Sequence, residues 1–145
     1  MIIVVDTNIV FSAIINGRGV IGDILFNSPT HYTFFSSEFM IDEISRYEDK
    51  LIKSSKLPLN KFKEAKASVL SQIELISEEI ISLKNWEKAY SLTFEIDKND
   101  TPFVALALEL EAILWTGDKK LINGLKNLDF DFCKSTDEIL FIRNY

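Results

Sequence analysis

The sequence predicts an α/β protein: a three-layer α/β/α sandwich with a mostly parallel, roughly five-stranded sheet. The first observation is the run Ile2 to Val5, which is wholly apolar and β-branched, as a strand buried on both faces of a parallel sheet would be. The second is that strand candidates alternate with helical segments, mostly one crossover apart. The third is size, because 145 residues with 47% hydrophobic content suffice for one domain, 1–145, with a substantial core.

Apolar periodicity and turn signals give the order of the elements. After the first strand, further strands are expected at 31–35, 73–77, 112–116 and 130–133. Helices are expected at 8–15, 20–26, from Ser36 or Ser37 to about 53, 59–70, 78–92, 100–110, 119–125 and 136–142. The helix that ends near residue 53 carries an apolar stripe at helical spacing, formed by Met40, Ile44, Tyr47 and Leu51. The helix that starts with the sequence DTP at 100–102 is nearly all apolar and must therefore be buried.

The composition excludes several kinds of protein. Cys133 is the only cysteine and His31 the only histidine, so neither an intrachain disulfide nor a Cys/His zinc site is expected, and a reducing, cytoplasmic setting follows. The first apolar run has no basic region before it and reaches Asp6 too early for a signal peptide. No later apolar run approaches the length of a membrane span. We therefore expect a soluble protein inside the cell, with no membrane partner.

The charges are unevenly distributed along the chain. A net charge of −6 argues against a general nucleic-acid coat protein, because phosphate affinity comes largely from Lys and Arg. Between Lys50 and Lys66, however, six lysines accompany Glu64 alone. Two interpretations of this stretch stay open, a solvated helical hairpin and a surface that faces phosphate groups.

Acidic residues stand where the predicted strands end. Asp6 directly follows the first strand, and Asp118 follows the fourth strand by two residues. Asp100 begins the buried helix, and Asp97 lies three residues before it. In open parallel sheets ligands bind outside the carboxyl ends of the strands, which makes these acids candidates for a site. Asp6 and Asp118, taken alone, are each also explained as a helix N-cap or a turn residue. Capping explains one of Asp97 and Asp100, and it explains both less well.

The helix with the apolar stripe offers one more candidate acid. At about 100° per residue, Glu43 falls about 60° from the centre of the stripe, on its edge. Glu38, Asp42 and Asp49 point at or beyond about 160° from it, and Glu48 lies about 80° away on the other edge. Glu43 is therefore the preferred site acid, with a solvated boundary residue as its alternative. Whether Glu43 rather than Glu38 or Asp42 fills this role stays open, since a shifted register would reassign it.

Four carboxylates at one end of the sheet would need a counter-charge. Each pair of them at about 4 Å would repel by roughly 4 kcal/mol at an effective dielectric constant of 20. Raised pKa values or a bound cation would have to offset this repulsion. Oxygen ligands without Cys or His suit Mg²⁺ or Mn²⁺, which often also contact a phosphate group. Two such ions about 4 Å apart could assist hydrolysis of a phosphodiester bond.

Four short motifs carry these acids. They are "VVDTN" at the first strand, "SSEFMIDEI" on the stripe helix, "DKNDTPFVALAL" at the buried helix and "LWTGDKKL" after the fourth strand. In the order and spacing of these motifs, the chain resembles the PIN-domain nucleases, including the VapC-like toxins of toxin–antitoxin pairs, over nearly all its length. The resemblance implies that Asp6, Glu43, Asp100 and Asp118 are the four catalytic acids of this chain.

The resemblance also implies a role for each site residue. Asp6, Asp100 and Asp118 are expected to hold the metal directly or through water, and Glu43 to complete the shell or orient the attacking water. If Thr7 or Asn8 caps the following helix, the Asp6 carboxylate stays free for the metal. The auxiliary positions are Asp97, Thr7, Asn8 and Thr116.

For the whole protein, the resemblance implies a parallel sheet with the first strand central and a Mg²⁺- or Mn²⁺-dependent endoribonuclease. It also implies a frequent homodimer and, for toxin members, a cognate antitoxin that blocks the site. Lys119 and Lys120 are candidates for RNA binding, with ordinary surface lysines as the alternative. Single-stranded or loop RNA is the expected substrate, because its bases are accessible for stacking. Trp86 and Trp115 are expected in the core.

Three other functions are alternatives to this one. Phosphatases of the haloacid-dehalogenase type also place an Asp after the first strand, but they need a second Asp two residues later, where this chain has Asn8. A Ser/His/Asp hydrolase is disfavoured because His31 stands at the start of a predicted strand, far from the acids, as a structural or surface histidine. A non-catalytic RNA- or protein-binding domain, with the carboxylates as helix caps, stays as the alternative.

Overall fold

The strands form a single parallel sheet with the first strand in its centre. The computed structural model of the chain describes all of residues 1–145. Its strands are β1 (Ile2–Val5), β2 (Thr33–Ser37), β3 (Ile73–Ile76), β4 (Ile113–Trp115) and β5 (Cys133–Lys134). The sheet order is β3-β2-β1-β4-β5, and every neighbouring pair is parallel. This sheet confirms the predicted α/β class.

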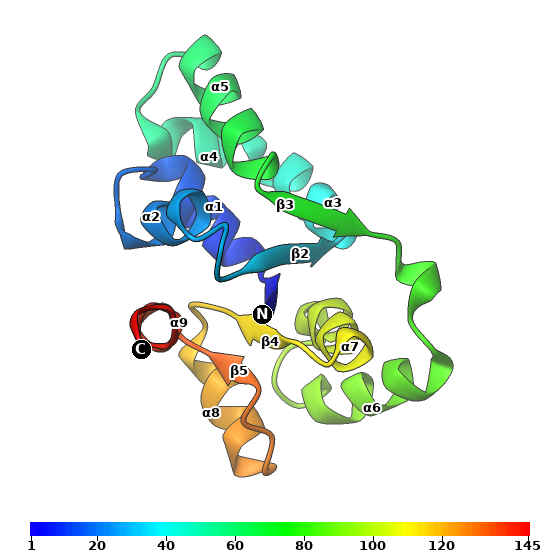
Figure 1. Cartoon of the computed structure of the whole chain (residues 1–145). Coiled ribbons are helices and arrows are strands. Elements are labelled where there is room, and N and C mark those ends of the chain that lie inside the picture. The colour runs from blue at the N-terminus through cyan, green and yellow to red at the C-terminus, as the bar shows by residue number, and fades with distance from the viewer.

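Helices cover both faces of the sheet. In Figure 1, α6 and α7 lie on one side of it, and α1, α2 and α9 lie on the other. Helix α7 contacts β1, β2 and β4, which makes it the central helix of its face. The α-helices are α1 (Thr7–Ile15), α2 (Val20–Asn27), α3 (Phe39–Arg46), α4 (Glu48–Ser55), α5 (Leu59–Leu70), α6 (Leu83–Thr93), α7 (Thr101–Leu110), α8 (Lys119–Asn127) and α9 (Thr136–Asn144), and the short 3-10 helices are η1 (Glu78–Ile80) and η2 (Lys98–Asp100).

Two of the predicted helices are divided. The helix expected to run to about residue 53 consists of α3 and α4, which meet at Tyr47, where φ of −106° and ψ of 12° leave the helical range. Tyr47 is 42% exposed and packs edge-on against Phe11, whereas Met40, Ile44 and Leu51 of the predicted stripe are buried. The helix expected over 78–92 consists of η1 and α6, because Ser82 caps α6 by accepting a hydrogen bond from the Asn85 N–H.

The core is centred on β1 and α7. The last three residues of β1 have no exposed surface, and every residue of 103–107 in α7 is buried, as the apolar sequence of this helix predicted. Trp115 is also fully buried, and its indole N–H donates to the Thr136 hydroxyl at 3.0 Å, which confirms its expected place in the core. Trp86 is only half-buried and packs at the edge of the core, so that expectation was right only in part.

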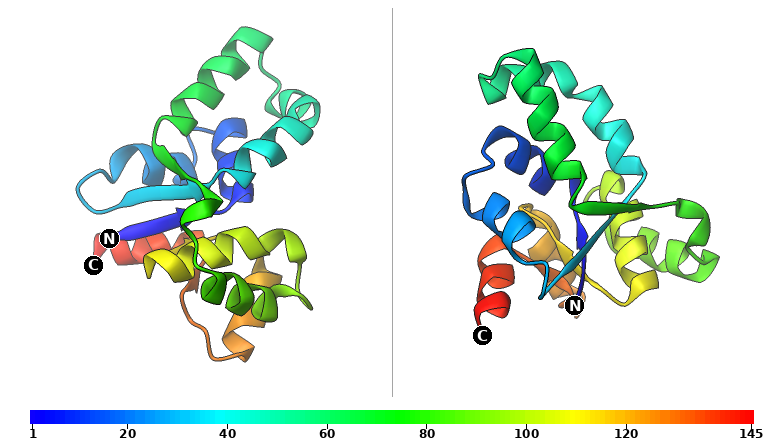
Figure 2. Two further views of the ribbon diagram at one scale, coloured as in Figure 1. Left: turned by 90° about the vertical axis from the view of Figure 1, so that its right-hand side faces the viewer. Right: turned by 45° about the horizontal axis from the view of Figure 1, so that its top comes forward.

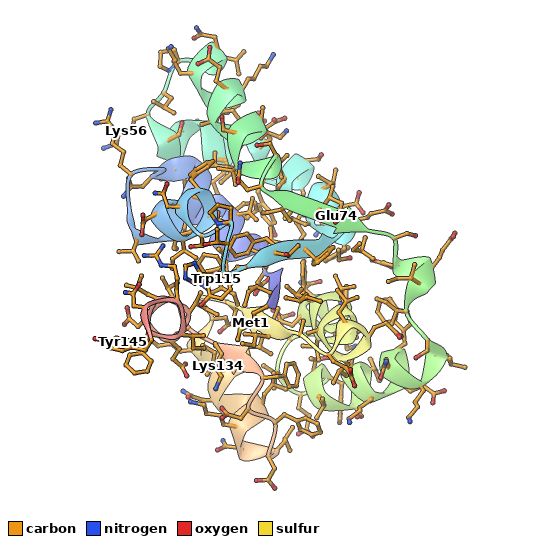
Figure 3. The ribbon with its side chains drawn as sticks, viewed as in Figure 1. Met1, Lys56, Glu74, Trp115, Lys134 and Tyr145 are labelled. Atoms are coloured by element: carbon orange, nitrogen blue, oxygen red, sulfur yellow. The ribbon has the colours of Figure 1, made fainter.

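Helices α4 and α5 form a hairpin that extends from one end of the molecule (Figure 1, Figure 2). In the turn between them, Lys56 adopts left-handed backbone angles with φ of 57°, and its side chain points away from the body of the protein (Figure 3). Lys66 pairs with Glu48 across the hairpin at 3.0 Å, and Lys61 pairs with Glu64 along α5 at 3.5 Å. The lysine-rich stretch is therefore a helical hairpin, and its role toward phosphate groups stays a prediction.

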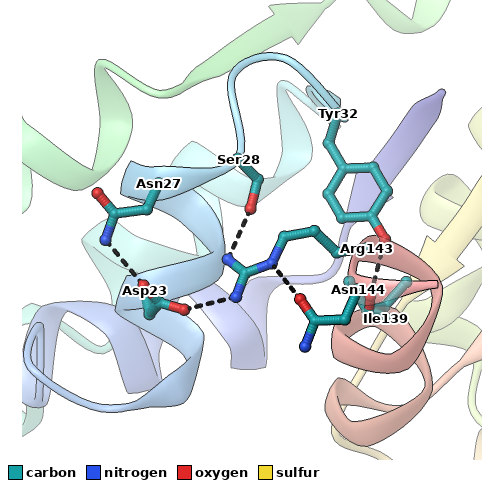
Figure 4. A network of polar contacts seen from close by, with 7 residues as sticks. All are labelled: Asp23, Asn27, Ser28, Tyr32, Ile139, Arg143 and Asn144. Atoms are coloured by element: carbon teal, nitrogen blue, oxygen red, sulfur yellow. Dashed lines mark hydrogen bonds and ion pairs between the residues drawn. The ribbon is translucent and has the colours of Figure 1, made fainter.

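The last helix is tied to α2 by a polar network (Figure 4). The Arg143 guanidinium donates to the Asp23 carboxylate at 2.9 Å and to the Ser28 hydroxyl at 3.0 Å. The Tyr32 hydroxyl donates to the carbonyl of Ile139 in α9 at 2.7 Å. These contacts hold α9 against α2, on the same side of the sheet as α1 (Figure 1).

No single helix is long and apolar enough to cross a membrane. Helices α1 and α2 meet that length and composition only when taken together, and they are bent by 103° at the break between them. Both helices contribute to the core of the sandwich, with Ile9, Val10 and Ile24 exposed by at most 1%.

Candidate active site

The topology brings the ends of β1 and β4 together. From β1 the chain builds β2 and β3 on one side of the sheet and then crosses to build β4 and β5 on the other. The change of direction leaves a crevice outside the carboxyl ends of β1 and β4, which is where open parallel sheets bind ligands. Val5 pairs with Trp115, so the next residues, Asp6 and Thr116, lie side by side. The Asp6 N–H donates to the Trp115 carbonyl at 3.0 Å, which extends the pairing into the crevice.

Asp6 is a buried carboxylate surrounded by hydrogen-bond donors. Its side chain is 5% exposed and accepts hydrogen bonds from the Thr116 hydroxyl at 2.7 Å, the Thr7 N–H at 2.7 Å and the Asn8 amide at 3.2 Å. Burial raises the pKa of Asp6 to about 6, with a smaller increase from the nearby acids Glu43 and Asp118, although the Thr116 and Thr7 hydrogen bonds favour the ionised form.

Asp6 is itself the N-cap of α1, which corrects one expectation. Capping by Thr7 or Asn8 was expected to leave Asp6 free, but Asp6 accepts the hydrogen bond from the first N–H of the helix through Oδ1. Thr7 and Asn8 instead direct their side chains to other residues of the crevice. Oδ1 of Asp6 therefore caps the helix, and Oδ2 accepts from Thr116 and Asn8.

Thr7 connects Asp6 to the stripe helix. Its backbone N–H donates to Asp6, and its hydroxyl donates to Glu43 Oε1 at 2.7 Å. Glu43 is half-buried, whereas Glu38 and Asp42 are exposed. Burial raises the pKa of Glu43, against the opposing effects of the Thr7 hydrogen bond and of Arg46. Three acids were open for this position, Glu43, Glu38 and Asp42. Glu43 is the one that the structure connects to Asp6, through the two hydrogen bonds of Thr7.

Asp100 has the most perturbed carboxyl group in the crevice. It closes η2 immediately before α7, is 8% exposed, and its Oδ2 is buried without any hydrogen-bond partner. Burial is the main reason that the pKa of Asp100 rises to about 8, and the charges of Asp6, Asp97, Asp118 and Glu43 add to the increase. A buried carboxyl oxygen with no partner is costly unless the group keeps its proton or gains a counter-charge.

Asp118 and Asp97 each cap a helix. Asp118 Oδ1 accepts from the Lys120 N–H at 2.9 Å and the Leu121 N–H at 3.4 Å, which makes it the N-cap of α8. Asp97 Oδ1 accepts from the Asn99 N–H at 2.9 Å at the start of η2, and its side chain is exposed. The capping explanation that the sequence allowed is thus correct for Asp6, Asp97 and Asp118, and it leaves their second oxygen atoms to other partners.

Asn8 and Thr116 fix the turn that follows β4. The Asn8 side chain donates to Thr116 Oγ1 at 3.2 Å and accepts from the Gly117 N–H at 3.0 Å. Thr116 Oγ1 in turn accepts from the Asp118 N–H at 3.1 Å. These bonds join α1 to the turn that carries Asp118. Lys119 and Lys120 follow in the first turn of α8 and are exposed.

The carboxylate oxygens of these acids are ligands that suit a hard divalent cation. No group of three or more His, Cys, Asp or Glu side chains is arranged as a ready-made metal cage. Mg²⁺ does not need such a cage, because it keeps several water molecules and is usually held by one or two carboxylates. The unpaired oxygen of Asp100 and the charges that raise its pKa are the features that a cation would relieve. We call the five side chains Asp6, Glu43, Asp97, Asp100 and Asp118 the acidic cluster.

Two features of this site have no signal in the amino-acid sequence. The hydrogen bond between Thr7 and Glu43 joins residues 36 positions apart, and helical spacing alone cannot predict it. An open pocket whose wall includes residues next to Asp100 could not be predicted either, because its lining comes from five separate helical segments, α3, η1, α6, η2 and α7. This aromatic pocket is lined by Phe39, Trp86, Tyr90, Lys98, Thr101 and Pro102, among others.

Fold and site together define an α/β protein with buried carboxylates at the switch point of a parallel sheet. The chain belongs to the PIN domain family, whose model matches residues 4–143. PIN domains are generally nucleases, so the family supports a hydrolase that acts on nucleic acid. The expected family likeness is thereby confirmed over nearly the whole chain.

Solved structures share this fold at low sequence identity. A chain of VapBC2 from Rickettsia felis, in a complex bound to a DNA fragment from its promoter, has a TM-score of 0.67 and 22% identity, covering 93% of this chain and 98% of that one. VapBC-1 from nontypeable Haemophilus influenzae has a TM-score of 0.65 and 19% identity, and the match covers 94% of this chain and 99% of that one. A PilT N-terminus domain protein from Sulfolobus solfataricus has a TM-score of 0.55 and 15% identity, and the match covers 99% of this chain and 93% of that one. No curated protein matches the sequence significantly.

Proposed function

We propose that this chain is a Mg²⁺- or Mn²⁺-dependent endoribonuclease that hydrolyses RNA phosphodiester bonds in the acidic cluster. The observation that carries the proposal is the buried Asp100 carboxyl, which has an unpaired oxygen and a pKa raised by burial and by four other acids. A carboxylate with a purely structural role would not be buried with an unpaired oxygen. A cation bound at the switch point of the sheet would give that oxygen a partner. Membership of a family of nucleases supports the same reaction.

Each residue of the cluster has a task in this mechanism. Asp6, Asp100 and Asp118 hold the cation through their oxygen atoms, directly or through water. The bound cation supplies positive charge to the phosphate group that is cleaved. Glu43 orients the attacking water and accepts its proton, a task that suits a half-buried carboxylate with a raised pKa. Thr7 holds Glu43 in position, since its hydroxyl donates to that carboxylate.

The substrate would approach an acidic surface. Without a cation the cluster repels RNA, so the metal and nearby lysines must supply the attraction. Lys119 and Lys120 directly follow Asp118 and are exposed, which suits contacts to the RNA backbone. Single-stranded or loop RNA is the preferred substrate because its bases can leave the stack.

We further propose that the chain is the cytoplasmic toxin of a toxin–antitoxin pair and forms a homodimer. Two structures that share its fold are described as VapBC assemblies, which supports a protein partner. Coexpression tests this part of the proposal. A small adjoining reading frame that suppresses growth arrest caused by the chain would support the toxin role, and harmless expression would remove that role without affecting the nuclease.

RNA cleavage with a metal chelator is the test of the enzymatic proposal. Purified chain should cleave RNA in Mn²⁺ and stop when EDTA is added. Asp6→Asn should be inactive, because Asn keeps the helix cap but offers a weaker ligand. Asp42→Asn, which changes an exposed acid on the same helix as Glu43, should cleave like the wild type. Metal-independent RNA binding without cleavage, unchanged in Asp6→Asn, would instead favour a non-catalytic binding domain.

A further inference from the structure

The wall of the aromatic pocket includes residues that are close in the chain to acids of the acidic cluster. Thr101 and Pro102 in its wall directly follow Asp100, and Lys98 precedes Asp100 by two residues. Phe39 lies on α3 one helical turn before Glu43. The pocket has a volume of about 570 Å³, within the range of roughly 300–1,000 Å³ that is usual for small-molecule sites. A ligand group in the pocket would therefore lie beside whatever the cluster binds.

The aromatic side chains of the pocket retain surface for a ligand. Tyr90 is 52% exposed, and Trp86, one turn earlier on α6, is half-buried. Tyr90 also stacks on Phe94 with the ring centroids 6.0 Å apart, so its plane is held in place. Phe39 is fixed by an edge-on contact with Phe103 at 6.1 Å. Rigid, partly exposed rings are surfaces on which a planar group can stack at little entropic cost.

Charged groups complete the pocket. The Lys98 ammonium lies in the wall on the side of η2, where it can meet a phosphate or a sugar oxygen. Glu78 and Glu87 line the same pocket and offer carboxylate oxygens. Only Glu78 has a partner among its neighbours, a long hydrogen bond of 3.4 Å from the Ser37 hydroxyl. The carboxylates favour a ligand with N–H donors, and the ammonium favours one that also carries negative charge.

We propose that the aromatic pocket binds one unstacked base of the RNA substrate, next to the phosphate that the acidic cluster cleaves. This inference rests on the proposed function. A nucleotide joins a planar aromatic group to a phosphate, which matches a pocket with aromatic rings and a lysine in its wall. Thr101 in that wall is the chain neighbour of Asp100, so a base in the pocket and a phosphate at the acidic cluster would be held by adjacent residues.

The carboxylates give the pocket a base preference. Guanine presents two adjacent N–H donors on its Watson–Crick edge, which a carboxylate can accept together. Uracil presents one N–H between two carbonyl acceptors, which a carboxylate repels. The pocket should therefore favour guanine over uracil, with Glu87 as the residue that reads the edge.

RNA binding by pocket variants tests the inference apart from catalysis. Fluorescently labelled single-stranded RNA is titrated with full-length chain carrying Asp100→Asn, in Mn²⁺, and the anisotropy is recorded. Adding Tyr90→Ala or Trp86→Leu should weaken binding by roughly 5- to 150-fold, the range that one stacked base is worth. Phe141→Ala removes a 62% exposed aromatic residue from α9 and should leave binding unchanged. Equal loss in Phe141→Ala, or none in Tyr90→Ala and Trp86→Leu, would overturn the inference.

Two further readouts make the result specific. Replacing single guanines by uracil should lower the affinity of the chain at one position of the oligonucleotide, and Glu87→Gln should reduce that difference. If Tyr90→Ala changes the mass measured by light scattering and not RNA affinity, the pocket is a contact between copies of this chain and the inference is wrong. Failure of the proposed function would appear differently, as an absence of cleavage in wild-type chain with RNA binding and its pocket dependence intact.

Discussion

At the scale of single residues, the carboxylates of this site have two tasks each. Asp6 caps α1 and Asp118 caps α8, yet both raise the pKa of Asp100 through their charge. A helix N-terminus stabilises a nearby carboxylate, so it partly compensates the burial of Asp6. Asp100 also stands at the start of a helix, α7, but its side chain makes no capping hydrogen bond there, and its Oδ2 has no partner. It is therefore the residue whose charge most depends on a ligand.

The raised pKa values predict how the stability of the metal-free chain changes with pH. Asp100 and Asp6 titrate near 8 and 6 when folded and near 3.8 when unfolded. Between about pH 4 and pH 8 the folded chain thus holds protons that the unfolded chain has released, and its free energy of unfolding falls as pH rises. In EDTA, the midpoint of thermal unfolding should be lower at pH 8 than at pH 5. Asp100→Asn should reduce this difference, and an equal or larger difference in that variant would contradict the assignment.

Most residues of the candidate site could be predicted from the sequence. Strand tips and the start of the buried helix pointed to Asp6, Asp100 and Asp118, because these positions follow from chain order alone. The partner of Glu43 did not follow, since its hydrogen bond to Thr7 depends on how α3 packs beside α1. The prediction that Thr7 or Asn8 caps α1 was wrong, because Asp6 caps it through Oδ1 while its Oδ2 accepts the hydrogen bond from Thr116.

At the scale of elements, the site is built from the starts of helices. Helices α1, η2 and α8 begin with Asp6, Asp97 and Asp118 as their N-caps, and α7 begins right after Asp100. Each start directs backbone N–H groups toward the crevice, where they favour negative charge. The acids are held in place by the helices that they cap.

Paired substitutions at Asp118 separate capping from metal binding. Asp118→Ala should lower the free energy of unfolding by about 0.5–2 kcal/mol, because the first turn of α8 loses its cap. Asp118→Asn keeps a capping oxygen and should be nearly as stable as wild type. Both variants should lose RNA cleavage in Mn²⁺. Denaturant unfolding and a cleavage assay measure the two effects, and an Asp118→Asn enzyme as active as wild type would exclude a metal-binding role.

The predicted elements were most accurate where apolar residues were continuous. The bounds of β1 and α5 match their predictions, since a run of buried residues or a clear proline break defines them. The break at Tyr47 was not predicted, because an apolar stripe continues across it at helical spacing. The last strand is only Cys133–Lys134, which pair with Leu114 and Trp115 of β4, so the predicted bounds 130–133 began too early.

At the scale of the whole molecule, positive and negative charge lie on different parts of the fold. The α4–α5 hairpin carries six lysines and one glutamate between residues 50 and 66, so the body of the protein carries the entire negative excess. The topology collects five of the body's acids in one crevice. Sequence alone predicted the parallel sheet and its central strand through family likeness, but the distances within the crevice required the packed fold.

The whole fold should be stabilised by a cation that relieves the acidic cluster. At a Mn²⁺ concentration of 100 times its Kd, the free energy of unfolding should rise by about 2.7 kcal/mol. Thermal unfolding with and without Mn²⁺ measures this as an upward shift of the midpoint. The shift should be much smaller in Asp100→Asn and unchanged in Asp42→Asn. An equal shift in wild type and Asp100→Asn would place Mn²⁺ elsewhere on the protein.

The most direct measurement of the central claim is the single-turnover rate of RNA cleavage by wild type and Asp100→Asn in Mn²⁺. The two side chains have the same shape, so the comparison isolates the charge and ligand strength of one buried carboxylate. We expect the rate to fall by at least about 100-fold in Asp100→Asn, to fall to background in EDTA, and to be unaffected in Asp42→Asn. Full activity of Asp100→Asn, or cleavage that persists in EDTA, would contradict a metal-dependent nuclease site in the acidic cluster.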